Sequence, residues 1–351
     1  MTMKVYLKNA KEVGFVPSRK QLLTELNPNE VLIKIISVSI CGTDLHIYNW
    51  DEWSQNRIKP PLTVGHEFSG EVIKVGSEVT KVKVGDIVSS ESHIVCGVCD
   101  YCKSGNGHIC PNTKVIGVDV DGCFAEYIKL PEANLFIDNS GLDPIYLSVL
   151  EPLGNAVHAV NKFDVKDKDV VIIGCGPLGL MGVDVAKANG AKTVIVSEVN
   201  EYRLNLAKEI GADYTINPLK EDVVAKVREY TNNEGADVVI DFAGNIDAIN
   251  DALEYIKPGG GLSILGVFNQ KINLDLNNIV FKGLNIYGVT GRLLPKTWED
   301  VDRLLKSKKL HFNKFVTHVL PFDELEKGIE IMKKGKSGKI ILKLWKKIIL
   351  H

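Results

Sequence analysis

The stretch Val170-Val171-Ile172-Ile173-Gly174-Cys175-Gly176-Pro177-Leu178-Gly179 decides the fold of this 351-residue chain. Its apolar beginning predicts a buried strand, and the three glycines follow the G-x-G-x-x-G spacing that joins a strand to a helix in dinucleotide-binding proteins. Gly174 permits the tight turn, Gly176 lets the backbone approach a pyrophosphate, and Gly179 allows close packing of helix on strand. The N–H groups at the start of that helix are then available to phosphate oxygens.

An acidic residue at the end of the next predicted strand indicates which dinucleotide would bind. Glu198 follows Gly179 by about 20 residues, where a carboxylate accepts hydrogen bonds from the adenosine ribose. A carboxylate there repels a 2′-phosphate, so the sequence favours NAD over NADP. Arg203 keeps NADP as an alternative cofactor, because its positive charge would tolerate the 2′-phosphate.

The pattern of the chain changes on either side of this motif. Before about residue 150, short β-rich stretches such as 30–40 and 68–76 alternate with turns, which is typical of an all-β or barrel-like domain. After about residue 165, strand and helix patterns alternate, which predicts an α/β region with a parallel sheet. A helical stretch and a last strand follow from about residue 295.

Composition and charge exclude several classes of protein. Hydrophobic residues make up 45% and charged residues 25%, as in an ordinary globular protein. The formal net charge of −2 gives no basic field for nucleic acid or an anionic membrane. There is no apolar run of the roughly 20 residues that a membrane span needs. The first 15 residues lack an apolar signal core, so we expect a cytoplasmic protein.

Four of the seven cysteines lie close together, at Cys96, Cys99, Cys102 and Cys110. We do not expect disulfides between them, because the cytosol keeps thiols reduced. Four thiolates at this spacing can close a tetrahedron around one structural zinc. An iron–sulfur cluster is the alternative, since iron also takes four cysteines.

A second metal site is suggested by residues that are farther apart. Cys41, His66, Glu67 and Glu151 offer a thiolate, an imidazole and carboxylates, which suit a zinc with one position open. Spacing alone does not decide this site, because single His and Glu residues usually have structural partners or face solvent.

Several motifs in a fixed order then identify a family. They are CGTDLH (41–46), GHEFSGEVIKVG (65–76), KVGDIV (83–88), the four-cysteine loop, DGCFAEY (121–127), EPLGNAVHA (151–159) and GCGPLG (174–179). With these motifs the chain resembles the zinc-dependent medium-chain alcohol dehydrogenases from end to end. The resemblance implies an α/β fold with three parts: a GroES-like, β-rich catalytic domain (1–150), a Rossmann domain with a doubly wound parallel sheet (151–294), and a C-terminal segment that returns to the catalytic domain (295–351).

The resemblance also implies roles for particular residues. Cys41, His66 and Glu67 would hold the catalytic zinc, and Glu151 would lie beside it as a movable ligand or a residue of the proton path. Thr43 and His46 match the family's proton relay, and His93 matches a histidine that shapes the substrate pocket. Leu178, Glu198 and Arg203 match residues that hold NAD. Contacts on the nicotinamide side match Leu265, Gly266, Val267, Val289 and Thr290.

Within the family, the chain is most similar to the threonine-oxidising members. The similarity implies oxidation of L-threonine to 2-amino-3-oxobutanoate, with NAD and two zinc ions per subunit, in a homotetramer. Arg292 is a weaker candidate partner for the substrate carboxylate. A zinc-dependent polyol or sugar dehydrogenase, of the sorbitol type, is the alternative, and a binding or sensory protein without activity is a third. His93, together with the loop NWDEW (49–53), argues against a polyol or sugar dehydrogenase. The intact set Cys41, Thr43, His46 and His66 argues against a binding or sensory protein.

Overall fold

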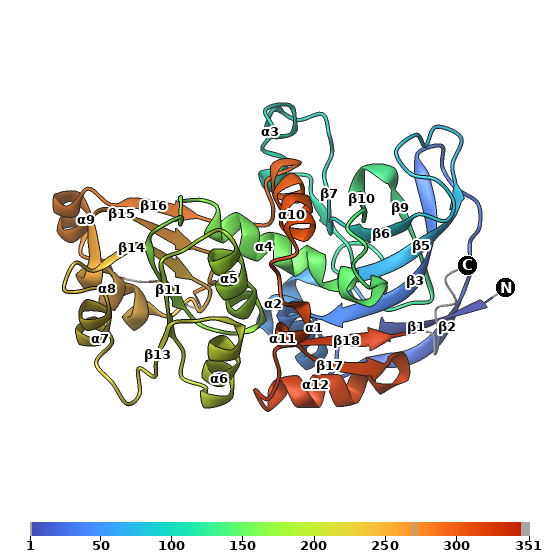
Figure 1. Ribbon diagram of the computed structural model, residues 1–351. Coiled ribbons are helices and arrows are strands. Elements are labelled where there is room, and N and C mark those ends of the chain that lie inside the picture. Colours follow the sequence, from blue (N-terminus) through green and yellow to red (C-terminus); the bar gives the residue numbers. More distant parts are fainter. Residues whose placement is uncertain (1, 269, 272, 345–351) are drawn as a thin grey trace.

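The computed structural model describes residues 2–344 except 269 and 272, and its elements gather into two bodies joined by α4 (Figure 1). The body on the left of Figure 1 contains a six-stranded parallel sheet, with strand order β13-β12-β11-β14-β15-β16. This is the order 3-2-1-4-5-6 of doubly wound sheets that bind dinucleotides. The predicted α/β fold with a Rossmann sheet is therefore confirmed.

The helices and strands of this body alternate along the chain. They are α4 (Leu150–Val160), β11 (Asp169–Ile173), α5 (Pro177–Ala188), β12 (Thr193–Ser197), α6 (Glu201–Ile210), β13 (Tyr214–Ile216), α7 (Val223–Tyr230), β14 (Ala236–Asp241), α8 (Ile246–Tyr255), β15 (Ile256–Ile264), α9 (Leu276–Lys282) and β16 (Asn285–Gly288). All five residues of β11 are buried, as expected for a central parallel strand that is covered on both faces.

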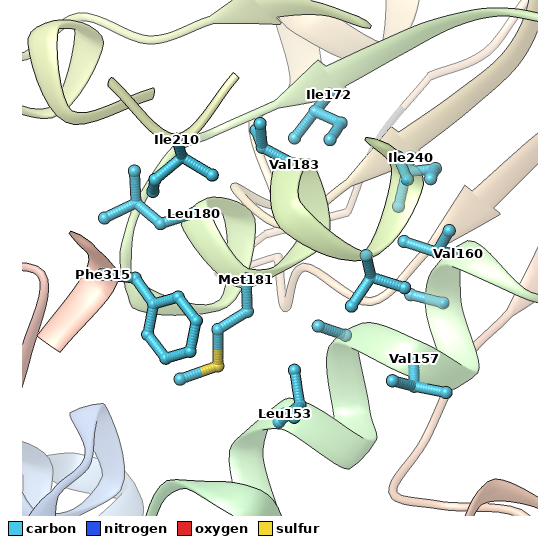
Figure 2. Close-up of a cluster of buried hydrophobic side chains, with 14 of the residues drawn as sticks. Leu153, Val157, Val160, Ile172, Leu180, Met181, Val183, Ile210, Ile240 and Phe315 are labelled. Carbon is cyan, nitrogen blue, oxygen red and sulfur yellow. The ribbon is translucent and has the colours of Figure 1, made fainter. Parts of the chain in front are cut away.

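The core on one face of this sheet is formed with α4 and α5. Figure 2 shows Leu153 of α4 below Met181 of α5, and Val183 of α5 beside Ile172 of β11. Phe315, from the C-terminal part of the chain, closes the same cluster. Burial of these side chains removes apolar area from water and fixes α4 against the sheet. Because α4 also carries Glu151, this core helps to place the candidate active site.

The other body is built mainly from antiparallel strands, and a β-rich N-terminal region was predicted. Its elements are β1 (Thr2–Lys8), β2 (Val16–Gln21), β3 (Glu30–Ile40), α1 (Gly42–Asn49), α2 (Glu52–Arg57), β4 (Leu62–Thr63), β5 (Phe68–Val75), β6 (Ile87–Ser90), β7 (His93–Ile94), α3 (Asp100–Lys103), η1 (Gly107–Ile109), β8 (Lys114–Val115), β9 (Tyr127–Pro131), η2 (Glu132–Asn134), β10 (Leu135–Ile137) and η3 (Pro144–Val149). Strands β10, β6, β5 and β3 are successive neighbours in its main sheet, and β9 pairs with β3 as well.

The last part of the chain completes both bodies. It contains α10 (Lys296–Ser307), α11 (Phe312–Phe315), β17 (Val316–Pro321), η4 (Phe322–Glu324), α12 (Leu325–Lys333) and β18 (Lys339–Lys343). Strand β18 pairs antiparallel with β3, with Ile341 opposite Ser39. Phe312 and Phe315 instead enter the core beside α4. Among the described helices, we find none with the length and apolar character needed to span a bilayer.

Candidate active site and metal centres

The first group of metal-ligating side chains forms where β3 and β5 lie side by side. Cys41 follows the last residue of β3, and His66 and Glu67 directly precede β5. Because the two strands are antiparallel, the end of one lies beside the beginning of the other. One donor atom from each of Cys41, His66 and Glu67, here called the Cys41 group, lies within 4.8 Å of the others. A thiolate, an imidazole and a carboxylate could hold a zinc with an open position.

Asp44, in the first turn of α1, contacts two members of the Cys41 group. Its Oδ2 accepts a hydrogen bond from the backbone N–H of Cys41 at 2.8 Å, and its Oδ1 lies 3.9 Å from Nδ1 of His66. Oδ1 of Asp44 and Nδ1 of His66 are both buried, and neither has a hydrogen-bond partner among the described residues. Burial disfavours a charged imidazole, but the nearby Cys41, Asp44 and Glu151 raise the pKa of His66 to about 10. The site therefore favours a positive charge, which a bound metal ion would supply.

Glu67 is held by a buried lysine that the sequence analysis missed. Nζ of Lys339, in β18, donates to Oε1 of Glu67 at 2.7 Å and to the carbonyl of Ile40 at 2.9 Å. The hydroxyl of Ser39 donates to the other carboxylate oxygen. Lys339 is 2% exposed and Glu67 is fully buried, so each charge depends on the other. The lysine thereby fixes the orientation of a carboxylate in the Cys41 group.

Glu151 is paired with a buried arginine and lies outside the Cys41 group. Nη1 of Arg292 lies 2.8 Å from Oε1 of Glu151, and the hydroxyl of Ser92 donates to the same oxygen at 2.5 Å. Burial acts to raise the pKa of Glu151, but the Arg292 guanidinium and His66 bring this pKa below its ordinary value. Glu151 is therefore a charged carboxylate at neutral pH.

His93 begins β7, and its ring is fixed by buried charges. Nδ1 of His93 lies 3.0 Å from Oε1 of Glu91 and 2.7 Å from Nη2 of Arg292. The Glu91 carboxylate also accepts hydrogen bonds from Nε of Arg292 at 2.6 Å and from Nε1 of Trp298 at 3.0 Å. His93, Glu91 and Trp298 line a largely apolar pocket of about 710 Å³. Sequence reasoning missed Glu91, because its partners lie about 200 positions later in the chain.

The suggested role of Arg292 as a partner for a substrate carboxylate is wrong. Arg292 is 1% exposed. Its guanidinium nitrogens already donate to Glu91, to Ser92 and to Oδ1 of Asn155, and one forms the ion pair with Glu151. Removing one partner of such a buried pair costs about 3–5 kcal/mol. Arg292 is an internal counter-ion of two carboxylates.

Thr43 and His46 lie three residues apart in α1, so their side chains share one face of the helix. Oγ1 of Thr43 lies 3.8 Å from Sγ of Cys41. The side chain of His46 is 62% exposed, and its Nδ1 lies 2.5 Å from Oδ2 of Asp51. The two residues thus extend from the Cys41 group towards solvent.

The four remaining metal-ligating cysteines meet in a projecting loop, residues 96–110, here called the cysteine lobe (α3 in Figure 1). Neighbouring sulfur atoms of the four residues are 3.5–4.0 Å apart. None of the four cysteines forms a disulfide. Four sulfurs in this arrangement could hold a zinc with no position left for substrate.

The glycine-rich loop joins β11 to α5 at the carboxyl edge of the parallel sheet. Gly174 has a φ of +80°, which favours glycine. A Cβ at Gly179 would lie 2.0 Å from the carbonyl oxygen of Gly174, whereas nothing lies within 4 Å of such an atom at Gly176. Gly176 therefore leaves room for a phosphate beside the first turn of α5, where Leu178 is half-buried.

Glu198 follows β12, and its carboxylate is hydrogen-bonded to the glycine-rich loop. Its two carboxylate oxygens accept hydrogen bonds from the backbone N–H of Cys175 at 2.7 Å and of Asn200 at 2.9 Å. Nε of Arg203 is buried without a partner among the described residues. Glu198 also lines a pocket of about 440 Å³. A carboxylate, an unpaired guanidinium nitrogen and this space fit the adenosine half of a dinucleotide.

The predicted nicotinamide contacts lie where β15 and β16 end. Leu265 and Gly266 follow β15, and their N–H groups bond to the carbonyl of Asp241 at 2.9 and 3.1 Å. Val267 is 90% exposed. Val289 and Thr290 directly follow β16, which pairs with β15. These residues share the carboxyl edge of the sheet with the glycine-rich loop, where doubly wound folds bind their ligands.

Comparison with known proteins agrees with this architecture. Residues 27–137 match the alcohol dehydrogenase GroES-like domain, and residues 177–307 match the zinc-binding dehydrogenase family. The chain is 51% identical to the L-threonine 3-dehydrogenase of Caldanaerobacter subterraneus subsp. tengcongensis over 92% of this chain and 94% of that one. It is also 51% identical to the L-threonine 3-dehydrogenase of Pyrococcus furiosus, over 90% and 92%.

A solved structure with the same fold is 2R,3R-butanediol dehydrogenase from Bacillus subtilis. The two chains superpose with a TM-score of 0.88 at 28% identity, covering 98% of this chain and all of that one. Both family matches and the identities to curated relatives agree with the motifs quoted above. The chain belongs to the zinc-dependent medium-chain alcohol dehydrogenase family.

Proposed function

We propose that this protein oxidises the β-hydroxyl of L-threonine to a ketone, giving 2-amino-3-oxobutanoate, with hydride transfer to NAD. The observation that carries the reaction type is the Cys41 group in the same chain as a glycine-rich dinucleotide loop. The substrate is inferred from the high identity to two enzymes named L-threonine 3-dehydrogenase.

The side chains around the Cys41 group have distinct proposed roles. Cys41, His66 and Glu67 would hold the catalytic zinc, which, when bound, makes the substrate hydroxyl more acidic while the cofactor accepts hydride. The hydroxyl of Thr43 accepts the proton, because a hydroxyl can both accept and donate. His46 carries the proton to solvent, with Asp51 orienting its ring. The charged Glu151 adds negative potential beside His66.

Substrate selection would depend on His93. L-threonine has an ammonium and a carboxylate next to the reacting hydroxyl, so its pocket needs polar groups that simple alcohols do not require. Glu91 and Arg292 fix Nδ1 of His93, which leaves Nε2 as the nitrogen for substrate. The pairing of Glu91 with Arg292 keeps the net charge of the supporting residues low.

The dinucleotide would lie along the carboxyl edge of the parallel sheet. Gly174, Gly176, Leu178 and Gly179 would bind its phosphates, and Glu198 with Arg203 its adenosine ribose. The nicotinamide end would contact the backbone at Leu265, Gly266, Val267, Val289 and Thr290. Glu198 is 7% exposed and already accepts two hydrogen bonds, so a 2′-phosphate beside it would meet a fixed negative charge. This supports NAD rather than NADP.

We further propose a structural zinc in the cysteine lobe and domain boundaries at residues 150 and 294. None of the seven described cysteines forms a disulfide, which suits a reducing cytoplasm. A homotetramer would cover an apolar surface beside edge strand β16, where Leu276, Val280 and Phe281 are 67%, 70% and 85% exposed. Edge strands next to such surfaces readily pair with a second copy.

The alternative is a polyol or sugar dehydrogenase, which would share this whole scaffold. The test is to measure NAD reduction by one enzyme preparation with L-threonine, sorbitol, glucose and 2,3-butanediol. We expect kcat/KM to be highest for L-threonine. A higher value for sorbitol or the diol would contradict the proposed substrate and support the alternative.

A further inference from the structure

Two histidines without a role in the proposed chemistry meet between the cysteine lobe and α4. His108 belongs to η1, within the lobe, and His158 to the last turn of α4. Their ring centroids are 5.8 Å apart and the ring planes are perpendicular. His158 is 3% exposed, and burial lowers the pKa of both imidazoles. Two neutral rings are therefore packed edge to face where the cysteine lobe meets α4.

The hydrogen bond of His158 assigns its tautomer. Nδ1 of His158 lies 2.8 Å from the carbonyl oxygen of Gly291. A carbonyl oxygen can only accept, so Nδ1 carries the proton and Nε2 does not. Nε2 of His158 and Nδ1 of His108 are both buried without partners among the described residues. Among the described residues, the His158 ring therefore has one hydrogen bond, and it goes to the Gly291 carbonyl.

The Gly291 carbonyl belongs to the loop that would contact the nicotinamide. Val289 and Thr290 immediately precede Gly291, and Arg292, the counter-ion of Glu91 and Glu151, follows it. Gly291 has a φ of +55°, and a Cβ there would lie 3.2 Å from Cε1 of His93. The single bond from His158 therefore holds a backbone that touches both proposed ligand sites.

The cysteine lobe also approaches this loop directly. Cδ1 of Leu294 lies 3.6 Å from the position that a Cβ of Gly107 would occupy. Gly107 and His108 are neighbours in η1, which lies between the third and fourth cysteines of the lobe. Closure of the four cysteines around a metal would fix η1, and with it the contacts of His108 with His158 and of Gly107 with Leu294.

We propose that His158 is a positioning residue that couples the cysteine lobe to the loop 289–294 and so sets the affinity for the nicotinamide end of the cofactor. His108 seats the ring of His158, and the Nδ1–H of His158 holds the Gly291 carbonyl. A metal held by the lobe would thus act on cofactor binding as well as on stability. The inference rests on the proposed dinucleotide site and not on the identity of the alcohol.

The first experiment measures NADH binding by fluorescence titration of the zinc-loaded enzyme without any alcohol. His158→Phe keeps a ring against His108 but removes the donor to Gly291, so NADH should bind about three- to tenfold more weakly, as for the loss of one hydrogen bond. His158→Asn keeps an amide N–H near the position of Nδ1 and should recover most of the affinity. His318→Phe, on β17, is the matched control and should bind like wild type.

A double-mutant cycle then tests the connection to the lobe. His108→Ala should weaken NADH binding, and the double variant His108→Ala/His158→Phe should be no weaker than His158→Phe alone, because both act through one bond. Hydrogen exchange of the loop 289–294 in the cofactor-free enzyme should be faster in both single variants, with zinc content unchanged.

Three results would overturn the inference. They are wild-type NADH affinity and loop exchange in His158→Phe, equal weakening in His158→Phe and His158→Asn, or effects that multiply in the double variant. Failure of the wild-type enzyme to bind NADH would instead refute the proposed cofactor site. The exchange measurement on the cofactor-free chain would still decide the coupling in that case.

Discussion

The cysteine lobe and the Cys41 group use similar ligand atoms but are assembled in different ways. The lobe takes all four sulfurs from residues 96–110, so a local loop closure is enough to bring them together. The Cys41 group requires the pairing of β3 with β5, and its Glu67 requires Lys339 from the C-terminal strand β18. The lobe offers four sulfurs to a metal ion, whereas the Cys41 group offers three protein donors. The first arrangement suits permanent metal retention, and the second suits exchange of substrate at the metal.

The sharpest test of this comparison removes one ligand from each group. Cys41→Ala should lower kcat/KM for L-threonine by about a thousandfold or more, because a catalytic metal supplies several kcal/mol of charge stabilisation. Its melting temperature should change little. Cys102→Ala should mainly lower the melting temperature, since structural zinc contributes folding energy. Kinetics, thermal unfolding and zinc content are measured on both variants. Equal losses of activity and melting temperature in the two variants would refute the assignment of a catalytic role to the Cys41 group and a structural role to the lobe.

Mild chelation should separate the two groups in the unmodified enzyme. The Cys41 group should lose its metal first, because it has fewer protein ligands and an open position. Activity should therefore fall while circular dichroism and the second zinc per subunit persist. Metal analysis at increasing chelator concentration tests the order of loss. Simultaneous loss of both metals, activity and fold would show that the sites do not differ in lability.

His93 tests whether the neighbourhood of the Cys41 group also selects substrate. His93→Ala should reduce kcat/KM for L-threonine roughly ten- to a hundredfold, as for the loss of a hydrogen bond to a charged group. Zinc content and NADH affinity should remain near wild type, and the gap to simple secondary alcohols should narrow. An equal reduction for every alcohol would assign His93 to general chemistry instead.

Lys339 tests the long-range part of the comparison. Lys339→Met removes the counter-ion of Glu67 and should weaken zinc binding at the Cys41 group about tenfold, within the range for residues that support metal ligands. Lys339→Arg retains the positive charge and should restore part of this affinity. The lobe zinc is an internal control in each competition with a chromophoric chelator. Unchanged zinc affinity in Lys339→Met would mean that Glu67 is oriented without the lysine.

The smallest expected effect concerns the cofactor. Glu198→Ser removes the carboxylate that would repel a 2′-phosphate, and the ratio of NAD to NADP use should fall roughly three- to tenfold. The bond to Cys175 is lost as well, so NAD binding should also weaken. Steady-state kinetics with both dinucleotides measure the ratio. Equal use of both cofactors by the wild-type enzyme would contradict the role given to Glu198.

Much of the candidate site could be predicted because its residues are close in sequence. The glycine-rich loop lies between an apolar strand and a helix, and each glycine has a local steric reason. The four cysteines span one short segment, so their spacing alone indicates a metal. The dispersed Cys41 group was ambiguous from spacing, and only the family motifs favoured it before the strands were seen to bring its three residues together.

The sequence by itself thus determined the parallel-sheet fold, the glycine-rich loop and the four-cysteine group, because these depend on periodicity and short-range spacing. Only the tertiary structure decided the partners of the buried charges. Arg292 bonds to Glu91 about 200 positions earlier, and Lys339 to Glu67 about 270 positions earlier. A buried charge needs a partner of opposite sign, but for Arg292 or Lys339 any of the chain's 44 Asp and Glu residues could supply it. The fold chooses that partner by bringing distant strands together.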